Sequence, residues 1–91
     1  TGTYFENYDR SDEKKLSTII AKELENGGRV VQLRFANKAA YKEAISELVD
    51  SGRLYNVLKN AKEKTKVKFS TDSLFYYKDS GQLLLTFVIE K

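Results

Sequence analysis

The sequence predicts a single α+β domain in which a mainly antiparallel sheet of three or four strands is packed by helices. The chain has 91 residues, which is room for one domain. Apolar residues recur with a helical period in three segments and alternate in others. Hydrophobic residues make up 41% of the chain, enough for a small core, and argue against disorder. The predicted order is α-β-α-α-β-β-β over residues 11–91, after an N-terminal arm or edge strand at 1–10.

The first helix is predicted over residues 11–26. Ser11 is a suitable N-cap, and the glycines at 27 and 28 are typical of a helix end, because glycine accepts the left-handed conformation there. The apolar face recurs at helical spacing, at Leu16, Ile19, Ile20 and Leu24. A strand is expected next, over 29–36, because Val31, Leu33 and Phe35 alternate with polar residues.

Two further helices are predicted on either side of Gly52. The first runs from an Asn37 N-cap to about residue 51, and the second covers residues 53–62. Apolar residues follow the helical period in both segments. The glycine break predicts an α-turn-α corner.

The remainder predicts β-structure. A strand is expected at 66–70, where Val67 and Phe69 alternate with lysines. Strands at 74–78 and 82–90 flank a short loop in which Gly81 is expected to supply a positive φ. The last strand is apolar on both faces and is therefore expected at the centre of the sheet. The predicted core comprises Leu16, Ile20, Leu24, Val31, Leu33, Phe35, Ile45, Leu48, Leu58, Val67, Leu85 and Phe87.

The composition argues against catalysis. The chain has no His and no Cys, so neither a thiolate nor an imidazole can act as nucleophile, base or metal ligand. Neither a phosphate-binding loop nor the carboxylate spacing of a calcium loop is present in the sequence. We therefore expect a binding module that is not an enzyme and has no cofactor, metal site or membrane partner. The absence of Cys fits a reducing cytosol, and it also fits many secreted bacterial proteins.

The positive charge is concentrated in one stretch. Residues 53–70 carry a net charge of +5, whereas the rest of the chain carries −2. On a strand at 66–70, lysines two residues apart would project from one side and could follow a phosphodiester backbone. The candidate phosphate-binding residues are Arg53, Lys59, Lys62, Lys64, Lys66 and Lys68. A solvated charged face is the simpler explanation of the same pattern.

Neighbouring tyrosines add a second candidate feature. Tyr76 and Tyr77 would point to opposite faces of one strand, so we expect at least one of them to be exposed. An exposed tyrosine near a row of lysines could stack on an unpaired base. It could equally anchor a protein interface, or simply pack across strands.

The element order resembles that of winged-helix DNA-binding domains, in which 53–62 would be the recognition helix and the last hairpin the wing. However, the strand at 29–36 is long for that fold, and the helix offers few base-reading groups. Residues 28–45 are also similar to the third strand and second helix of RNA-recognition motifs. Gln32 and Arg34 stand where those motifs have stacking aromatics. Neither resemblance identifies a family.

Two function classes follow from these features. The first is a small nucleic-acid-binding module that contacts DNA or RNA through the basic stretch, with Tyr76 or Tyr77 stacking. The second is a protein-interaction module, such as a phage- or plasmid-type inhibitor or regulator, or an interaction domain of a larger protein. In the second case, exposed aromatics bind while lysines complement an acidic partner. A homodimer is compatible with both classes.

Overall fold

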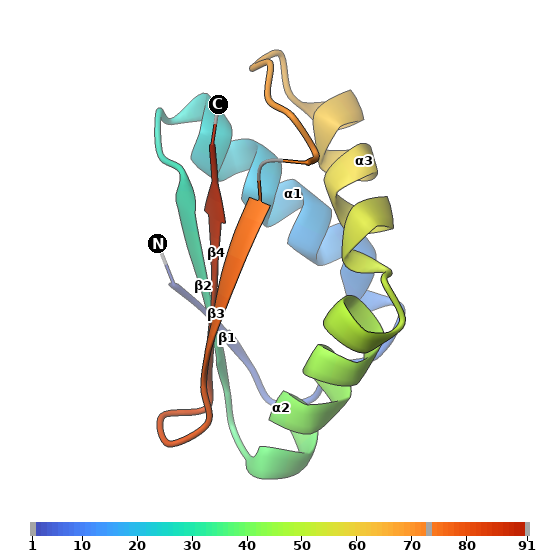
Figure 1. Cartoon of the computed structure of the whole chain (residues 1–91), viewed down its shortest axis with the longest axis vertical. Helices are drawn as coiled ribbons and strands as arrows, with labels where there is room; N and C mark the ends of the chain where they lie inside the picture. Colours follow the sequence, from blue (N-terminus) through green and yellow to red (C-terminus); the bar gives the residue numbers. More distant parts are fainter. Residues whose placement is uncertain (1, 73, 91) are drawn as a thin grey trace.

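A four-stranded sheet carries the helices on one of its faces (Figure 1). The structure is a computed structural model, and it describes residues 2–72 and 74–90. The elements are, in chain order, β1 (Gly2–Phe5), α1 (Asp12–Glu25), β2 (Val30–Phe35), α2 (Lys38–Ile45), the π-helical turn η1 (Ser46–Asp50), α3 (Leu54–Lys64), β3 (Leu74–Asp79) and β4 (Leu84–Ile89).

The strand order is β1-β2-β4-β3. The β2–β4 and β3–β4 pairs are antiparallel, whereas β1 runs parallel to β2 and is connected to it through α1. The α+β class of a single small domain is confirmed, with a mixed sheet rather than a purely antiparallel one. The central position expected for the last strand is also confirmed, because β4 lies between β2 and β3.

The two faces of the sheet differ in coverage. Register partners such as Leu33 and Leu85 share the inner face, against which the helices pack, and both are fully buried. Arg34 and Leu84 are partners on the outer face, where no residue of β2 is buried. The sheet is therefore an open-faced layer with a single helical cover.

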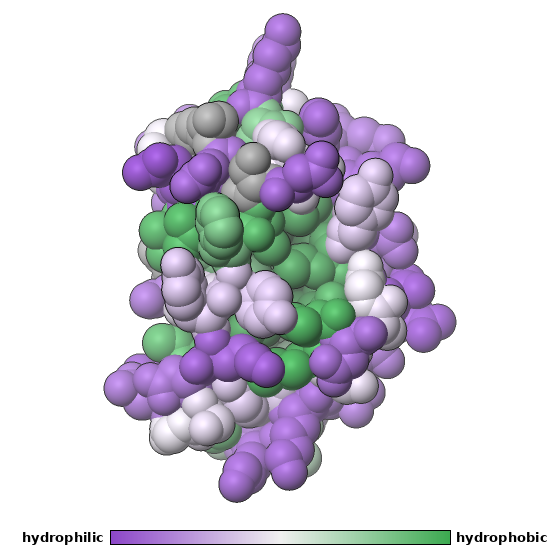
Figure 2. Space-filling model, in the orientation of Figure 1, coloured by the Kyte–Doolittle hydropathy of each residue, from purple (hydrophilic) through white to green (hydrophobic). Residues whose placement is uncertain are grey.

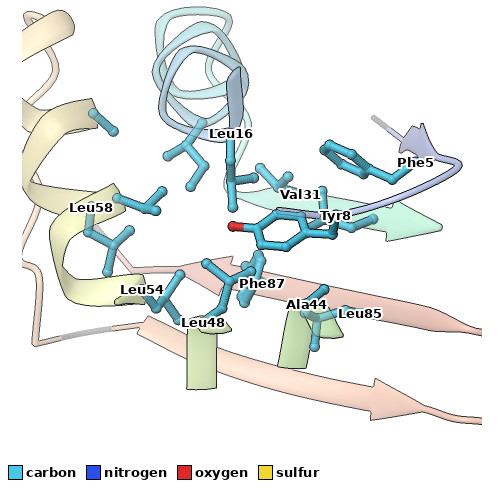
Figure 3. Packing of buried hydrophobic residues seen from close by; sticks show 14 of the residues in the cluster. Phe5, Tyr8, Leu16, Val31, Ala44, Leu48, Leu54, Leu58, Leu85 and Phe87 are labelled. Carbon is cyan, nitrogen blue, oxygen red and sulfur yellow. The ribbon is translucent and has the colours of Figure 1, made fainter. Parts of the chain in front are cut away.

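The core fills the space between the inner face and the helices (Figure 3). All of the predicted core residues are buried except Ile45 and Val67, which are half-buried and pack against the core. The N-terminal segment adds two aromatics to it. The ring of Phe5 stacks on Phe35 at 5.7 Å between centroids and meets the edge of Tyr8 at 5.9 Å. These contacts hold the first strand against the domain.

The two predicted N-caps have different outcomes. Asn37 caps α2 as expected, because its side-chain oxygen accepts a hydrogen bond from the Ala40 backbone N–H at 2.8 Å. Ser11 makes no capping bond and has helical backbone angles. The carboxylate of Asp9 accepts the backbone N–H of Ser11 at 2.8 Å instead. Asp12 in turn accepts the Asp9 backbone N–H at 2.9 Å, so the turn before α1 closes through these two carboxylates.

The strand expected at 66–70 does not form. Hydrogen bonds to side chains hold this segment to the end of α1: the Glu25 carboxylate accepts from the Thr65 hydroxyl at 2.9 Å and from the Lys66 N–H at 3.2 Å. The alternation in the sequence is an alternation of burial. Val67 and Phe69 turn toward the core while the lysines between and before them point outward. Alternation alone does not supply the neighbouring backbone that a strand needs.

The glycine expected to open the last hairpin is not the residue with a positive φ. Among the described residues, positive φ occurs at Gly27, Gly52 and Leu83. The turn covers residues 80–83, and the Asp79 side chain accepts the backbone N–H groups of Gly81 at 3.1 Å and Gln82 at 3.2 Å. The left-handed residue is therefore Leu83, whose side chain packs against the core.

Two phenylalanines on opposite faces of the sheet test this layered arrangement. Phe87→Ala removes a fully buried ring and is expected to lower the free energy of unfolding by about 3–5 kcal/mol. Phe75→Ala removes a ring that is 51% exposed, and the loss should stay below about 1 kcal/mol. Urea denaturation of both variants measures the difference. Equal losses would contradict the assignment of the buried face.

Candidate binding surface

The edge strand β3 exposes three consecutive aromatic side chains. Phe75, Tyr76 and Tyr77 have exposed fractions of 51%, 42% and 61%. The expectation that at least one tyrosine is exposed is met by both of them. Tyr76 pairs in register with the fully buried Phe87, so the helical layer stops covering the inner face between β4 and β3.

An apolar groove runs beside this strand on its inner face. It has a volume of about 320 Å³ and lies between β3 on one side and η1 and α3 on the other. Figure 2 shows it as a green hollow bordered by paler and purple side chains. The residues that line it are Leu48, Val49, Gly52, Leu54, Tyr55, Leu58, Thr71, Leu74 and Tyr76. Its floor contains buried leucines of the core, and its rim contains two exposed tyrosines, at 55 and 76.

Two of the predicted basic residues lie beside the groove. Tyr55, Lys59 and Lys62 are four and three residues apart, so they form one stripe along α3. Because Tyr55 lines the groove, this stripe is the flank of α3 that borders it. Lys66 and Lys68 are exposed on the segment between α3 and β3. Within the described parts of the chain, none of these four lysines forms an ion pair or a side-chain hydrogen bond.

The other two predicted basic residues are engaged on the opposite flank of α3. Arg53 binds the Glu13 carboxylate through Nε and through Nη2, the latter at 3.2 Å. Lys64 donates to the Thr18 hydroxyl of α1 at 3.1 Å. The structure thus places Tyr76 on the rim of the groove, and Lys59 and Lys62 on the flank of α3 that carries the groove residue Tyr55. It directs Arg53 and Lys64 toward α1, and Tyr77 lies on the outer face.

Sequence reasoning left three residues of this surface out of the candidate site. The helical period places Tyr55 on the same face of α3 as Lys59, because the two residues are four positions apart. Phe75 and Lys78 belong to the same strand as the two selected tyrosines. Their exposure depends on where the helical layer ends, and no local pattern in the sequence gives that position.

A partly buried ion pair joins α1 to the start of α3, and the Tyr8 phenol of the N-terminal segment lies near it. The hydrogen bond from Arg53 to Glu13 raises the pKa of the Arg53 guanidinium. Burial raises the pKa of the Tyr8 phenol well above its ordinary value, and the nearby Glu13 carboxylate adds to the effect. The Tyr8 hydroxyl is buried without a hydrogen-bond partner among the described residues. The contact of Arg53 with Glu13 therefore has a structural role, and it engages the Arg53 guanidinium.

Other kinds of site are not found in the described part of the chain. It contains no group of three or more carboxylates arranged to hold a metal ion. None of its helices has the length and apolar character needed to cross a membrane.

Comparisons with family models, curated proteins and solved structures find no match to this chain. The resemblances in element order to winged-helix domains and in one segment to RNA-recognition motifs are therefore not extended to a family.

Substitution of Tyr8 tests the effect of burying its phenol. Tyr8→Phe removes a hydroxyl that has no partner among the described residues, so the free energy of unfolding at pH 7 should stay the same or rise by about 1 kcal/mol. Above pH 10 the unfolded chain loses the phenol proton while the folded chain keeps it, so wild-type stability should fall with rising pH. In Tyr8→Phe the fall in the free energy of unfolding with rising pH should be smaller than in wild type, by up to about 1.4 kcal/mol per pH unit.

Urea titrations at several pH values between about 8 and 11 measure the slope. Tyr77→Phe is the matched control, because its ring is 61% exposed, and it should leave the slope unchanged. An alkaline slope that is identical in wild type and Tyr8→Phe would contradict the role given to burial of this phenol.

Proposed function

We propose that this domain is a protein-interaction module that binds its partner through β3 and the adjacent groove. The observation that carries the proposal is the exposure of Phe75, Tyr76 and Tyr77 on an unpaired strand edge. Such an edge is a template for pairing with another chain, and proteins that do not use it generally shield it. Here the strand keeps three large aromatics, which are the side chains enriched in interfaces.

The groove supports a partner with side chains to bury. Its apolar floor is continuous with the core through the buried side chains of Leu48, Leu54 and Leu58. A side chain that enters it would be removed from water while the tyrosines on its rim keep their hydroxyl groups accessible for hydrogen bonding. The cysteine-free composition is compatible with a reducing cytosol, where we propose that the module acts.

Nucleic-acid binding is the second candidate, and a specific observation favours it. The four lysines at 59, 62, 66 and 68 are exposed and unengaged by other described residues, and Tyr76 lies across the groove from the α3 stripe. Ammonium groups in this state can displace the counterions of a phosphate backbone. The protein-binding proposal is preferred because the strand row of lysines is absent and Arg53 and Lys64 are bound to α1.

Paired variants on the two edge strands test the protein-binding proposal. Tyr76→Ser combined with Tyr77→Ser should reduce recovery of a protein partner from a lysate of the source organism by at least tenfold, because the contact area is lost. Tyr4→Ser is the matched control, since Tyr4 is 56% exposed on the opposite edge strand, and it should recover the partner normally. Equal recovery by all variants would contradict the proposal, as would recovery that nuclease treatment abolishes.

A salt titration tests the second candidate. Replacement of Lys59, Lys62, Lys66 and Lys68 by Ala should weaken binding to fluorescent 20-nucleotide DNA and RNA, both single-stranded and duplex. It should also flatten the dependence of log Kd on log salt between about 50 and 200 mM. A double Ala variant of the α2 residues Lys38 and Lys42 is the control. Nucleic-acid binding that is equally tight and equally salt-dependent in both variants would eliminate this surface as a phosphate contact.

A further inference from the structure

We propose that the partner contributes an extended, acidic segment that pairs with β3 as a fifth strand and places apolar side chains in the groove. This inference rests on the proposed function and names the chemistry of the partner. It combines three features of β3 and of the helix and segment that precede it: an open strand edge, an apolar groove and an excess of lysines.

The strand edge determines that the segment is extended. β3 pairs with β4 on one side, and no strand of the described residues lies on the other, so the outward backbone groups of residues 74–79 can form a ladder with a further strand. A segment that pairs there projects alternate side chains toward the inner face, which is the face of the groove. The partner is therefore expected to carry apolar residues at every second position.

The groove sets the size of these residues. Its volume of about 320 Å³ would accept one or two apolar side chains of the partner. Leu74 and Tyr76 are the β3 side chains that line it, and Leu54 and Leu58 lie opposite on α3. An apolar side chain of the partner, placed between these residues, would extend the apolar cover of the inner face, which the helices leave incomplete beside β3.

The charges around the groove select an acidic segment. Lys59 and Lys62 lie on the same flank of α3 as Tyr55, which lines the groove, and Lys78 projects from the same face of β3 as Tyr76. Lys66 and Lys68 lie on the segment that joins these two elements. Residues 59–78 hold six lysines, these five and Lys64, against two carboxylates, at positions 63 and 72. Glu25 and Asp79 flank this stretch, and both carboxylates already accept hydrogen bonds: Glu25 from Thr65 and Lys66, and Asp79 from two backbone N–H groups in the turn.

The same charges disfavour a second copy of this chain as the occupant. Antiparallel pairing of two β3 strands in one continuous sheet would place both helical layers on the same side. The lysine-bearing flanks of the two α3 helices would then approach each other, at a Coulomb cost. An acidic segment would be attracted by the same lysines that would repel each other in a dimer.

Selection from a phage-displayed library of random 12-residue peptides on the immobilised 91-residue chain tests the inference. The enriched peptides should carry a net negative charge and apolar residues at alternate positions. Their affinity for Tyr76→Ser should be at least tenfold weaker than for wild type, whereas Tyr4→Ser should bind them normally. The charge-reversed double variant Lys59→Glu, Lys62→Glu should enrich peptides that lack the acidic excess.

The outcomes separate this inference from the proposed function. Enriched peptides that require Tyr76 but carry no acidic excess would overturn the inference and leave the protein-binding proposal intact. Peptides whose affinity is unaffected by changes at Tyr76 and Phe75 would overturn both. A dimer that sedimentation detects and Tyr76→Ser dissociates would identify a second copy as the occupant, against the inference. Displacement of the peptides by a single-stranded oligonucleotide at low micromolar concentration would favour nucleic acid instead.

Discussion

The extent of the helical layer determines the rest of this structure. The helices cover the inner faces of β2 and β4, where alternate residues are fully buried, and the cover ends before β3. The register pair of Phe87 and Tyr76 marks the boundary: the first side chain is fully buried, and the second, one strand away, is 42% exposed. Adjacent strands are only about 4.8 Å apart, so the change is abrupt. The exposed aromatics and the groove are both consequences of that boundary.

The boundary falls on the side of α3 that faces away from α1. α1 and α3 pack against each other and are joined by the contact of Arg53 with Glu13 and by that of Lys64 with Thr18. Both contacts lie on the flank of α3 opposite the groove. The same contacts use two of the six basic residues in the stretch 53–70. Those that remain unengaged are on the groove flank of α3 and on the segment that follows it.

The local patterns in the sequence predicted most of the fold. The helical faces, the break at Gly52, the N-cap at Asn37 and the central last strand are each set by neighbours in the sequence, and all are confirmed. The failures concern long-range partners. The alternation at 66–70 has no neighbouring strand, and the turn after β3 closes through the Asp79 side chain with Leu83 in the left-handed region. The sequence predicts Tyr76 and the lysines as candidate binding residues, and this stays a prediction. It does not predict Tyr55, which the structure places on the rim of the groove.

We propose that the open edge of β3 and the groove beside it receive a partner chain. Hydrogen exchange of the backbone amides, measured on the free domain and with a saturating selected peptide, tests it most directly. Alternate amides of β3 should become protected on binding, because they enter a new ladder, while the amides of β1 on the opposite edge should be unchanged. Protection that appears at β1, or binding that leaves the amides of β3 unchanged, would contradict it.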